Sequence, residues 1–512
     1  MIRARSIAPV LSGILLTLSF PPLCWYYLAW IAFIPLFWAV DGVSLKDSFK
    51  IGLIAGFSHY LTLLYWITIA IGRYGNMGLF VQLLSLFLLC IYLSLYFGMF
   101  CYLFRLSYDR WFSVILVPSF WTLLEFLRAR LLSGFPWCLL GYSQFGFKTL
   151  IQVADITGVY GISLLVMMGN TTLYNIFFVK REGYIKGLLL NLTIFTTLLL
   201  LVLVYGNYRL RYFKNPEGGY SFKVSIIQGN MDQSIKWNPA YQRQTIEKYI
   251  RLTYLTKRFS PDLIVWPETA LPFFFQEDSP FSKKIRELSK EMKAYILFGS
   301  PAYGRGHPRR FYNRAYLLSP SGKEVSYYDK VHLVPFGEYL PFKGVFSFLR
   351  GLLPNFGEFE SGSSLDPLRF KDISMGILIC FESIFPELSS EEVRRGAGVL
   401  VNITNDAWFG NSSAPYQHFQ MGAFRAVENR VYLIRCANTG ISGIVDPAGR
   451  VIAESNLFKE EVINLQIHIY NHLSFYTRHP EAFIYFILII CIIGLSYIGV
   501  EKKREKGGRV YV

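Results

Sequence analysis

The sequence predicts a polytopic α-helical membrane domain of about eight spans, with one polar α/β domain inserted before the last span. Three observations predict this class. Of the 512 residues, 53% are hydrophobic, and the mean hydropathy of +0.33 is high for a soluble protein. Charged residues are sparse in residues 1–210 and frequent in residues 211–481. Apolar runs of the length that a bilayer requires, about 20 residues, recur in the first segment and return at residues 482–512.

Each apolar run is expected to form one helix, because only a helix satisfies its own backbone in lipid. Residues 7–40 are the exception. Pro21-Pro22 breaks this stretch, and proline ends helices, so we expect two short helices joined by the proline pair. Residues 1–23 begin like a signal peptide, but no small-x-small cleavage site follows, so we expect an uncleaved first span. The other predicted spans are residues 51–71, 79–104, 112–127, 160–179, 187–206 and 482–500.

The basic residues of the short loops predict the orientation. By the positive-inside rule, the side with more Lys and Arg is cytoplasmic, so residues 211–481 face outward. The net charge of +16 therefore mainly reflects topology, and nucleic acid is not an expected partner because no basic binding motif accompanies it. The richer side holds Arg3, Arg5, Lys46, Lys50, Arg105, Arg110, Lys180, Arg181, Lys186, Lys502, Lys503, Arg504, Lys506 and Arg509; the other holds Arg73, Arg128, Arg130 and Lys148.

After Gly218-Gly219, short β-branched runs alternate with charged amphipathic stretches, which is typical of an α/β layer fold. Polar residues follow several predicted strands: Glu268, Cys380 and Asp406. Ligand sites in α/β sheets gather at the carboxyl ends of strands, so these residues indicate one site. The predicted strands are 222–228, 263–266, 295–299, 375–379, 398–403, 431–437, 442–445 and 461–465, and the predicted helices are 240–258, 280–292 and 417–429.

Taken singly, each of these residues has an ordinary structural interpretation. A lone cysteine is usually a small buried side chain, and Lys330 alone would be a solvated surface charge. The seven cysteines are too few and too scattered for a disulfide scaffold. His332 and His418 have no partners at metal-ligand spacing, so no metal site is predicted.

Five short sequence motifs taken together are far more specific than any of these residues alone. In chain order, they resemble the nitrilase (carbon–nitrogen hydrolase) superfamily. The string Lys-Trp-Asn-Pro at 236–239 and the flanking spans make the whole chain similar to the apolipoprotein N-acyltransferase family within it. The motifs are Gln-Gly-Asn at 228–230, Trp-Pro-Glu-Thr at 266–269, Asp-Lys-Val-His-Leu-Val-Pro-Phe-Gly-Glu-Tyr at 329–339, Ile-Cys-Phe-Glu at 379–382 and Asn-Asp-Ala-Trp-Phe-Gly at 405–410.

The resemblance implies a nitrilase-like αββα sandwich as the second domain, with domains at residues 1–210, 211–481 and 482–512. It implies transfer of an acyl chain from a phospholipid, usually phosphatidylethanolamine, to the α-amino group of the N-terminal diacylglyceryl-cysteine of an apolipoprotein. The family uses a cysteine thioester, with no cofactor and no metal. The implied location is the bacterial inner membrane, with the catalytic domain facing the periplasm.

The resemblance also implies roles for individual residues. Glu268 would be the general base, Lys330 the oxyanion stabiliser and Cys380 the nucleophile, and Glu338 matches the second glutamate of the family. Phe381 stands where tyrosine is expected, which puts a hydrogen-bonding role at that position in doubt. The residues matched to the substrate side are Trp237, Phe381, Glu382 and Trp408.

Two other functions are consistent with parts of the sequence. A membrane-tethered amidase would share the Glu, Lys and Cys residues but would discharge its intermediate to water. A transporter or assembly scaffold with an inactive nitrilase-like domain would need no reactive cysteine. Few ionisable residues occur within the predicted spans, so no charged transport pathway is indicated.

Overall fold

The computed structural model describes residues 2–75, 77–179, 185–213, 220–234, 236–304, 310–341, 358–470 and 473–507. Gly218-Gly219 and the basic residues Lys180, Arg181 and Arg509 lie outside the described residues. The chain divides into two compact units. The first comprises Met1–Tyr65, Leu83–Arg211 and His479–Val512, and the second comprises Trp66–Gln82 and Tyr212–Arg478. The short segment Trp66–Gln82, which the sequence groups with the membrane helices, thus packs with the polar unit.

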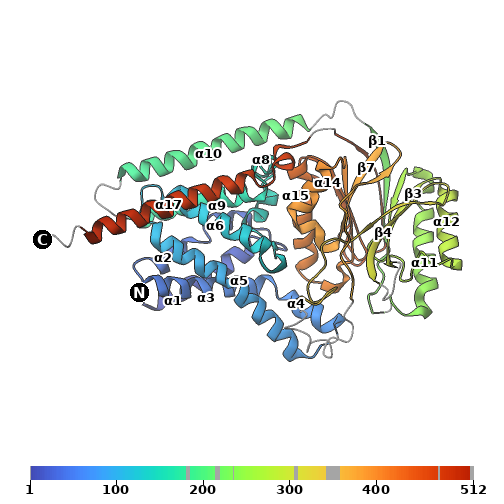
Figure 1. Ribbon diagram of the computed structural model, residues 1–512, viewed down its shortest axis with the longest axis horizontal. Helices are drawn as coiled ribbons and strands as arrows, with labels where there is room; N and C mark the ends of the chain where they lie inside the picture. Colours follow the sequence, from blue (N-terminus) through green and yellow to red (C-terminus); the bar gives the residue numbers. More distant parts are fainter. Residues whose placement is uncertain are drawn as a thin grey trace. The chain divides into compact units, whose positions relative to one another are not determined.

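The first unit is helical (Figure 1), and its longer helices overlap the apolar runs. The turn between the first two helices contains Pro21-Pro22. Ser44 caps the third, because its hydroxyl accepts the N–H of Asp47 at 3.1 Å. The principal helices are α1 (Ile2–Leu18), α2 (Ile34–Val40), α3 (Leu45–Leu63), α5 (Leu79–Ser107), α6 (Ser113–Arg130), α9 (Val159–Phe178), α10 (Ile185–Tyr212) and α17 (Ala482–Gly507).

The structure supports fewer spans than the eight expected. Among the described residues, four helices are long and apolar enough to cross a bilayer, and a fifth arises if Leu45–Leu63 and Trp66–Arg73, bent by 48°, form one broken span. The stretch at 7–40 is split into two short helices, as expected, and neither has the length of a span. Helix α6 carries Glu125, whose Oε1 accepts the N–H of Leu140 at 2.6 Å, so this helix packs polar groups inside the unit.

The second unit contains two six-stranded sheets. Their strand orders are β12-β1-β2-β3-β4-β5 and β11-β10-β9-β8-β7-β6. The strands are β1 (Ser221–Gln228), β2 (Leu263–Val265), β3 (Tyr295–Tyr303), β4 (Phe311–Leu318), β5 (Glu324–Asp329), β6 (Leu368–Phe370), β7 (Ile373–Ile379), β8 (Val399–Thr404), β9 (Tyr432–Ala437), β10 (Gly443–Val445), β11 (Val451–Glu454) and β12 (Glu461–His468).

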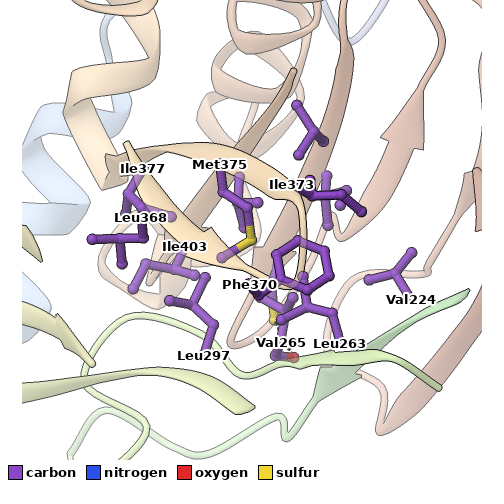
Figure 2. Close-up of a cluster of buried hydrophobic side chains, with 14 of the residues drawn as sticks. Val224, Leu263, Val265, Leu297, Leu368, Phe370, Ile373, Met375, Ile377 and Ile403 are labelled. Atoms are coloured by element: carbon purple, nitrogen blue, oxygen red, sulfur yellow. Dashed lines mark hydrogen bonds between the residues drawn. The ribbon is translucent and has the colours of Figure 1, made fainter. Parts of the chain in front are cut away.

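The sheets pack face to face through their apolar side chains. Side chains alternate along a strand, so Leu263 and Val265 of β2 enter the core between the sheets, whereas Ile264 points to the outer helices. Figure 2 shows this core, where Leu297 of the first sheet lies near Ile403 of the second.

Helices cover the two outer faces of the sandwich. Helices α11 (Pro239–Tyr254) and α12 (Pro280–Met292) pack on the first sheet, and α14 (Pro386–Arg394) and α15 (Ala414–Asn429) pack on the second (Figure 1). The polar unit is therefore an αββα sandwich, as the resemblance implied.

Candidate active site

Three candidate catalytic residues follow strands that end at the same edge of their sheets. Strands β1, β2 and β3 are parallel, and β5 runs in the same direction because β4 is antiparallel to both β3 and β5. Glu268 follows β2 and Lys330 follows β5. In the second sheet β7, β8 and β9 are parallel, and Cys380 directly follows β7. The fold thus brings together residues that are far apart in sequence.

Lys330 lies between two carboxylates. Its Nζ is 2.8 Å from Glu338 Oε2 and 3.8 Å from Glu268 Oε1, and its side chain is only 1% exposed. Burial alone would lower the pKa of Lys330, but the charges of Glu338 and Glu268 outweigh burial and hold the pKa above its ordinary value. Lys330 therefore remains an ammonium group at neutral pH.

Two further polar residues, which sequence reasoning missed, complete the carboxylate side of the site. Asn313 Nδ2 donates to Glu268 Oε1 at 2.8 Å and to Glu338 Oε1 at 3.0 Å, and so fixes the two carboxylates relative to each other. Lys236 Nζ donates to the backbone carbonyl of Glu268 at 3.3 Å. Burial lowers the pKa of Lys236 to about 8, although the charges of Glu268 and Cys380 act in the opposite direction. The only sequence signal for Asn313 is a polar residue on the buried side of β4.

Cys380 occupies a strained position at the end of β7. Its φ of 54° lies in the left-handed region, which costs a non-glycine residue about 1–2 kcal/mol. Burial raises the pKa of the Cys380 thiol, the charge of Glu268 raises it further, and Lys330 only partly opposes them. The resting side chain is therefore a thiol, and a nucleophilic reaction at Cys380 requires a base to remove its proton.

Glu382 connects the Lys330 segment to the Cys380 segment. Its Oε1 accepts the N–H of Val331 at 2.7 Å and the next N–H along the chain at 2.9 Å, and its Oε2 accepts the N–H of Ile379 at 2.6 Å. The side chain is fully buried. The resemblance assigned Glu382 to the substrate side; in this structure its carboxylate accepts backbone N–H groups that adjoin Lys330 and Cys380.

We expect Glu382→Gln to remove a pH-dependent component of stability. Burial raises the pKa of Glu382 to about 7, against the backbone N–H groups that lower it. Because the folded-state pKa exceeds the ordinary value of about 4.3, ionisation of this group disfavours folding, so its contribution falls as pH rises from about 4.3 through 7 and then levels off. Thermal unfolding of the two full-length proteins in detergent from pH 4 to 8 should show the wild type losing stability relative to the variant. A constant difference across that range would contradict the assignment.

The aromatic residues of the predicted substrate side occupy different surroundings. Trp237, half exposed, lines a cavity of about 670 Å³ together with Phe273, Phe274 and Phe359. Phe381 is buried against Phe385, with ring centroids 5.0 Å apart, so an aromatic packing role is retained without a hydroxyl. Trp408 is 38% exposed.

These residues define a class of protein. A cysteine at a strained strand end, a buried lysine and a carboxylate beside that lysine are side chains of the kind that nucleophilic acyl chemistry uses. The carbon–nitrogen hydrolase family model matches residues 223–470, and the model of the apolipoprotein N-acyltransferase N-terminal domain matches residues 12–172. The αββα unit is a carbon–nitrogen hydrolase domain.

Curated relatives extend the similarity over the whole chain. The apolipoprotein N-acyltransferase of Geobacter metallireducens is 44% identical over 98% of this chain and 96% of the relative. That of Rickettsia prowazekii is 34% identical over 80% of this chain and 81% of the relative. The chain belongs to the apolipoprotein N-acyltransferase family, which confirms the resemblance inferred from the sequence.

Solved structures are also similar to part of this chain. The Saccharomyces cerevisiae Nit3 structure, a member of branch 10 of the nitrilase superfamily, is 20% identical, with a TM-score of 0.39, and the match covers 51% of this chain and 95% of that chain.

Proposed function

We propose that this protein transfers an acyl chain from a membrane phospholipid to the α-amino group of the N-terminal diacylglyceryl-cysteine of apolipoproteins. The acyl chain passes through a thioester on Cys380, and phosphatidylethanolamine is the proposed donor. One observation carries the proposal. In a chain of this family, Glu268 and Lys330 lie 3.8 Å apart, and both are near enough to Cys380 for their charges to act on the pKa of its thiol.

The first half-reaction forms the thioester. Glu268 removes the proton from the Cys380 thiol, and the thiolate attacks the ester carbonyl of the phospholipid. The Lys330 ammonium stabilises the negative charge that develops on the carbonyl oxygen. When the tetrahedral intermediate collapses, the C–O bond breaks and Glu268 returns the proton to the leaving lysophospholipid.

The second half-reaction transfers the acyl chain to nitrogen. The uncharged α-amine of the lipoprotein attacks the thioester carbonyl, and Lys330 again faces the developing oxyanion. Glu268 accepts a proton from the attacking nitrogen and passes it to the departing Cys380 sulfur. One amide and one free thiol result, so the enzyme returns to its starting state.

Glu338 and Asn313 position these groups. Both oxygens of Glu338 bind protein donors, since Oε1 accepts from Asn313 at 3.0 Å and Oε2 accepts the N–H of Val334 at 2.8 Å. Glu338 therefore orients Lys330 and leaves proton transfer to Glu268. This division lets two carboxylates beside one lysine have different roles.

The proposed location is the bacterial inner membrane, with residues 211–481 facing the periplasm, where lipoprotein substrates would meet the site. A reporter that is active only outside the cytoplasm should be active when fused near residue 300 and inactive when fused after Val512. The expectation follows from the excess of basic residues in the predicted cytoplasmic loops. The opposite pattern would overturn the orientation.

The decisive test is labelling of the enzyme by its donor. Full-length protein incubated with phosphatidylethanolamine labelled in its acyl chain, without acceptor, should acquire label that neutral hydroxylamine releases. Cys380→Ser should acquire no thioester label. A diacylglyceryl peptide with a free N-terminus should then discharge the label into an amide, and the N-acetylated peptide should not.

Each other outcome favours a specific alternative. Discharge to water as fast as to the peptide would favour the amidase-like hydrolase. Full lipoprotein maturation in cells that carry only Cys380→Ala would favour the scaffold. Labelling by phosphatidylglycerol but not by phosphatidylethanolamine would correct the donor and leave the thioester step intact.

A further inference from the structure

The backbone carbonyl of Cys380 is held by buried side chains. The Ser383 hydroxyl donates to this oxygen at 3.0 Å, and His418 Nε2 lies 3.2 Å from it. Asn402 Nδ2 approaches the same oxygen at 3.4 Å and donates to the Leu378 carbonyl at 2.9 Å. Because Cys380 has a left-handed φ, its position depends on contacts that hold this turn.

His418 is itself oriented by a buried ion pair. Its Nδ1 lies 2.9 Å from Asp406 Oδ1 and 3.1 Å from Arg435 Nη2, and Arg435 binds Asp406 Oδ2 at 2.6 Å. Burial and the Arg435 charge lower the pKa of His418, although Asp406 opposes them, so the ring is neutral at pH 7. In the neutral ring the Nδ1 proton faces Asp406 Oδ1 at 2.9 Å, so Nε2 is the acceptor. The Ser383 hydroxyl, 3.0 Å from Nε2 and 3.0 Å from the Cys380 carbonyl oxygen, links the ring to that carbonyl.

Ser383, His418 and Asp406 have the order and spacing of a Ser-His-Asp triad, but they are not a second catalytic centre. Their side chains are buried, with exposed fractions of 0%, 1% and 0%. The Ser383 hydroxyl lies 3.0 Å from both His418 Nε2 and the Cys380 carbonyl oxygen. The arrangement therefore acts on the backbone of the nucleophile.

The imidazole ring also contacts aromatic residues that lead to the N-terminal half of the chain. Phe409, on the same short turn η8 (Asp406–Phe409) as Asp406, lies edge-on to His418 with centroids 6.3 Å apart. Trp66 lies edge-on to Phe409 at 4.8 Å, and its Nε1 donates to Gln417 Oε1 at 3.2 Å. Trp66 is 3% exposed and belongs to the segment that packs with the polar unit.

We propose that His418 is a positioning residue for the Cys380 nucleophile and that Trp66, contributed by the N-terminal half of the chain, holds His418 in place. This inference rests on the proposed role of Cys380. It gives the segment Trp66–Gln82 a function in the reaction, because Trp66 of this segment adds a contact that supports the nucleophile from outside residues 212–478.

The first experiment compares three substitutions of His418 in the full-length enzyme. His418→Gln can place an amide oxygen near the position of Nε2, whereas His418→Asn reaches only the position of Nδ1, and His418→Ala has neither. The rate of acyl-enzyme formation from labelled phosphatidylethanolamine is measured against donor concentration. We expect Gln to stay within about 10-fold of wild type, and Asn and Ala to lose about 10²-fold at saturating donor with unchanged half-saturation, since small displacements of a nucleophile have effects of this size.

Thr477→Val is the matched structural control. Thr477 is fully buried in the same unit and its hydroxyl donates to Asn429 Oδ1 at 2.9 Å. This variant should lose thermal stability without losing the labelling rate of the folded fraction. Equal rates for all three His418 variants and the wild type, or a loss in Thr477→Val equal to that in His418→Ala, would overturn the proposal.

The second experiment tests whether Trp66 acts through His418. Trp66→Ala should lower the labelling rate about 10-fold in the wild type and have no further effect in His418→Ala, because residues in one network are not additive. Additive losses would overturn the Trp66 link. Cys380→Ala distinguishes failure of the proposed function from failure of the positioning role. Label on that variant would refute the proposed function. If Cys380→Ala stays unlabelled and the His418 variants are labelled at the wild-type rate, the positioning role alone is refuted.

Discussion

Glu268→Gln is expected to lower the rate of acyl-enzyme formation by about 10²–10⁴-fold, the usual contribution of a general base. The reason is the thiol form of Cys380, whose raised pKa makes proton removal part of the reaction. The glutamine oxygen can still accept from Asn313, which now donates to Glu268 Oε1 at 2.8 Å, so the fold should be retained. The measurement is labelling by acyl-labelled phospholipid under single-turnover conditions.

Glu338→Gln is the control for this prediction. This substitution removes the same charge from the other carboxylate that binds Lys330. In the proposed mechanism, however, Glu338 orients Lys330 and does not transfer protons. We expect a loss of about 10-fold, less than the roughly 10²-fold that a 1 Å misplacement of a reacting group can cost. A normal labelling rate for Glu268→Gln would remove it as the base, and a larger loss for Glu338→Gln would exchange the two roles.

Lys330→Met is expected to lower the same rate by about 10²–10³-fold, with half-saturation by phospholipid nearly unchanged, because the ammonium acts on the oxyanion of the transition state. Lys330→Arg should not restore the rate. The Lys330 site is 1% exposed and is enclosed by Glu338 and Glu268, and a planar guanidinium cannot occupy the position of a compact ammonium.

Lys236→Met is the matched control, since Lys236 is also a buried lysine near Glu268. Its Nζ binds the backbone carbonyl of Glu268, so we expect a smaller loss of rate than for Lys330→Met. Folded protein is quantified by size-exclusion chromatography in detergent. If Lys330→Met lowered the amount of folded protein as much as the labelling rate, its role would be structural.

The elements that could be predicted from sequence are those whose pattern is local. Strand β8 is buried along its whole length and β7 from Met375 onward, so each is a short, mainly apolar run between turns. Strand β5, with the sequence Glu-Val-Ser-Tyr-Tyr-Asp, lies at a sheet edge and is largely exposed, and strand β4 carries Asn313 and Arg314 among its apolar residues. Neither was predicted, because a partly exposed or polar strand lacks the apolar pattern.

The span count illustrates the same limit. Hydropathy identified the apolar runs, but it does not detect the 48° bend between Leu63 and Trp66, nor the pairing of Glu125 inside the helical unit. A run that bends or buries charge is apolar in composition without being a straight span. Length and composition of the helices therefore support four or five spans where the apolar runs predicted eight.

The sequence by itself determined the division into apolar and polar parts, several of the buried strands, and the order of Glu268, Lys330 and Cys380, because each depends on neighbouring residues. Only the tertiary structure decided which groups support the site. Asn313 joins two carboxylates from different segments, and Trp66 binds Gln417 across 351 residues of sequence. Such contacts depend on how strands and turns pack in three dimensions, so no periodicity or spacing along the chain contains them.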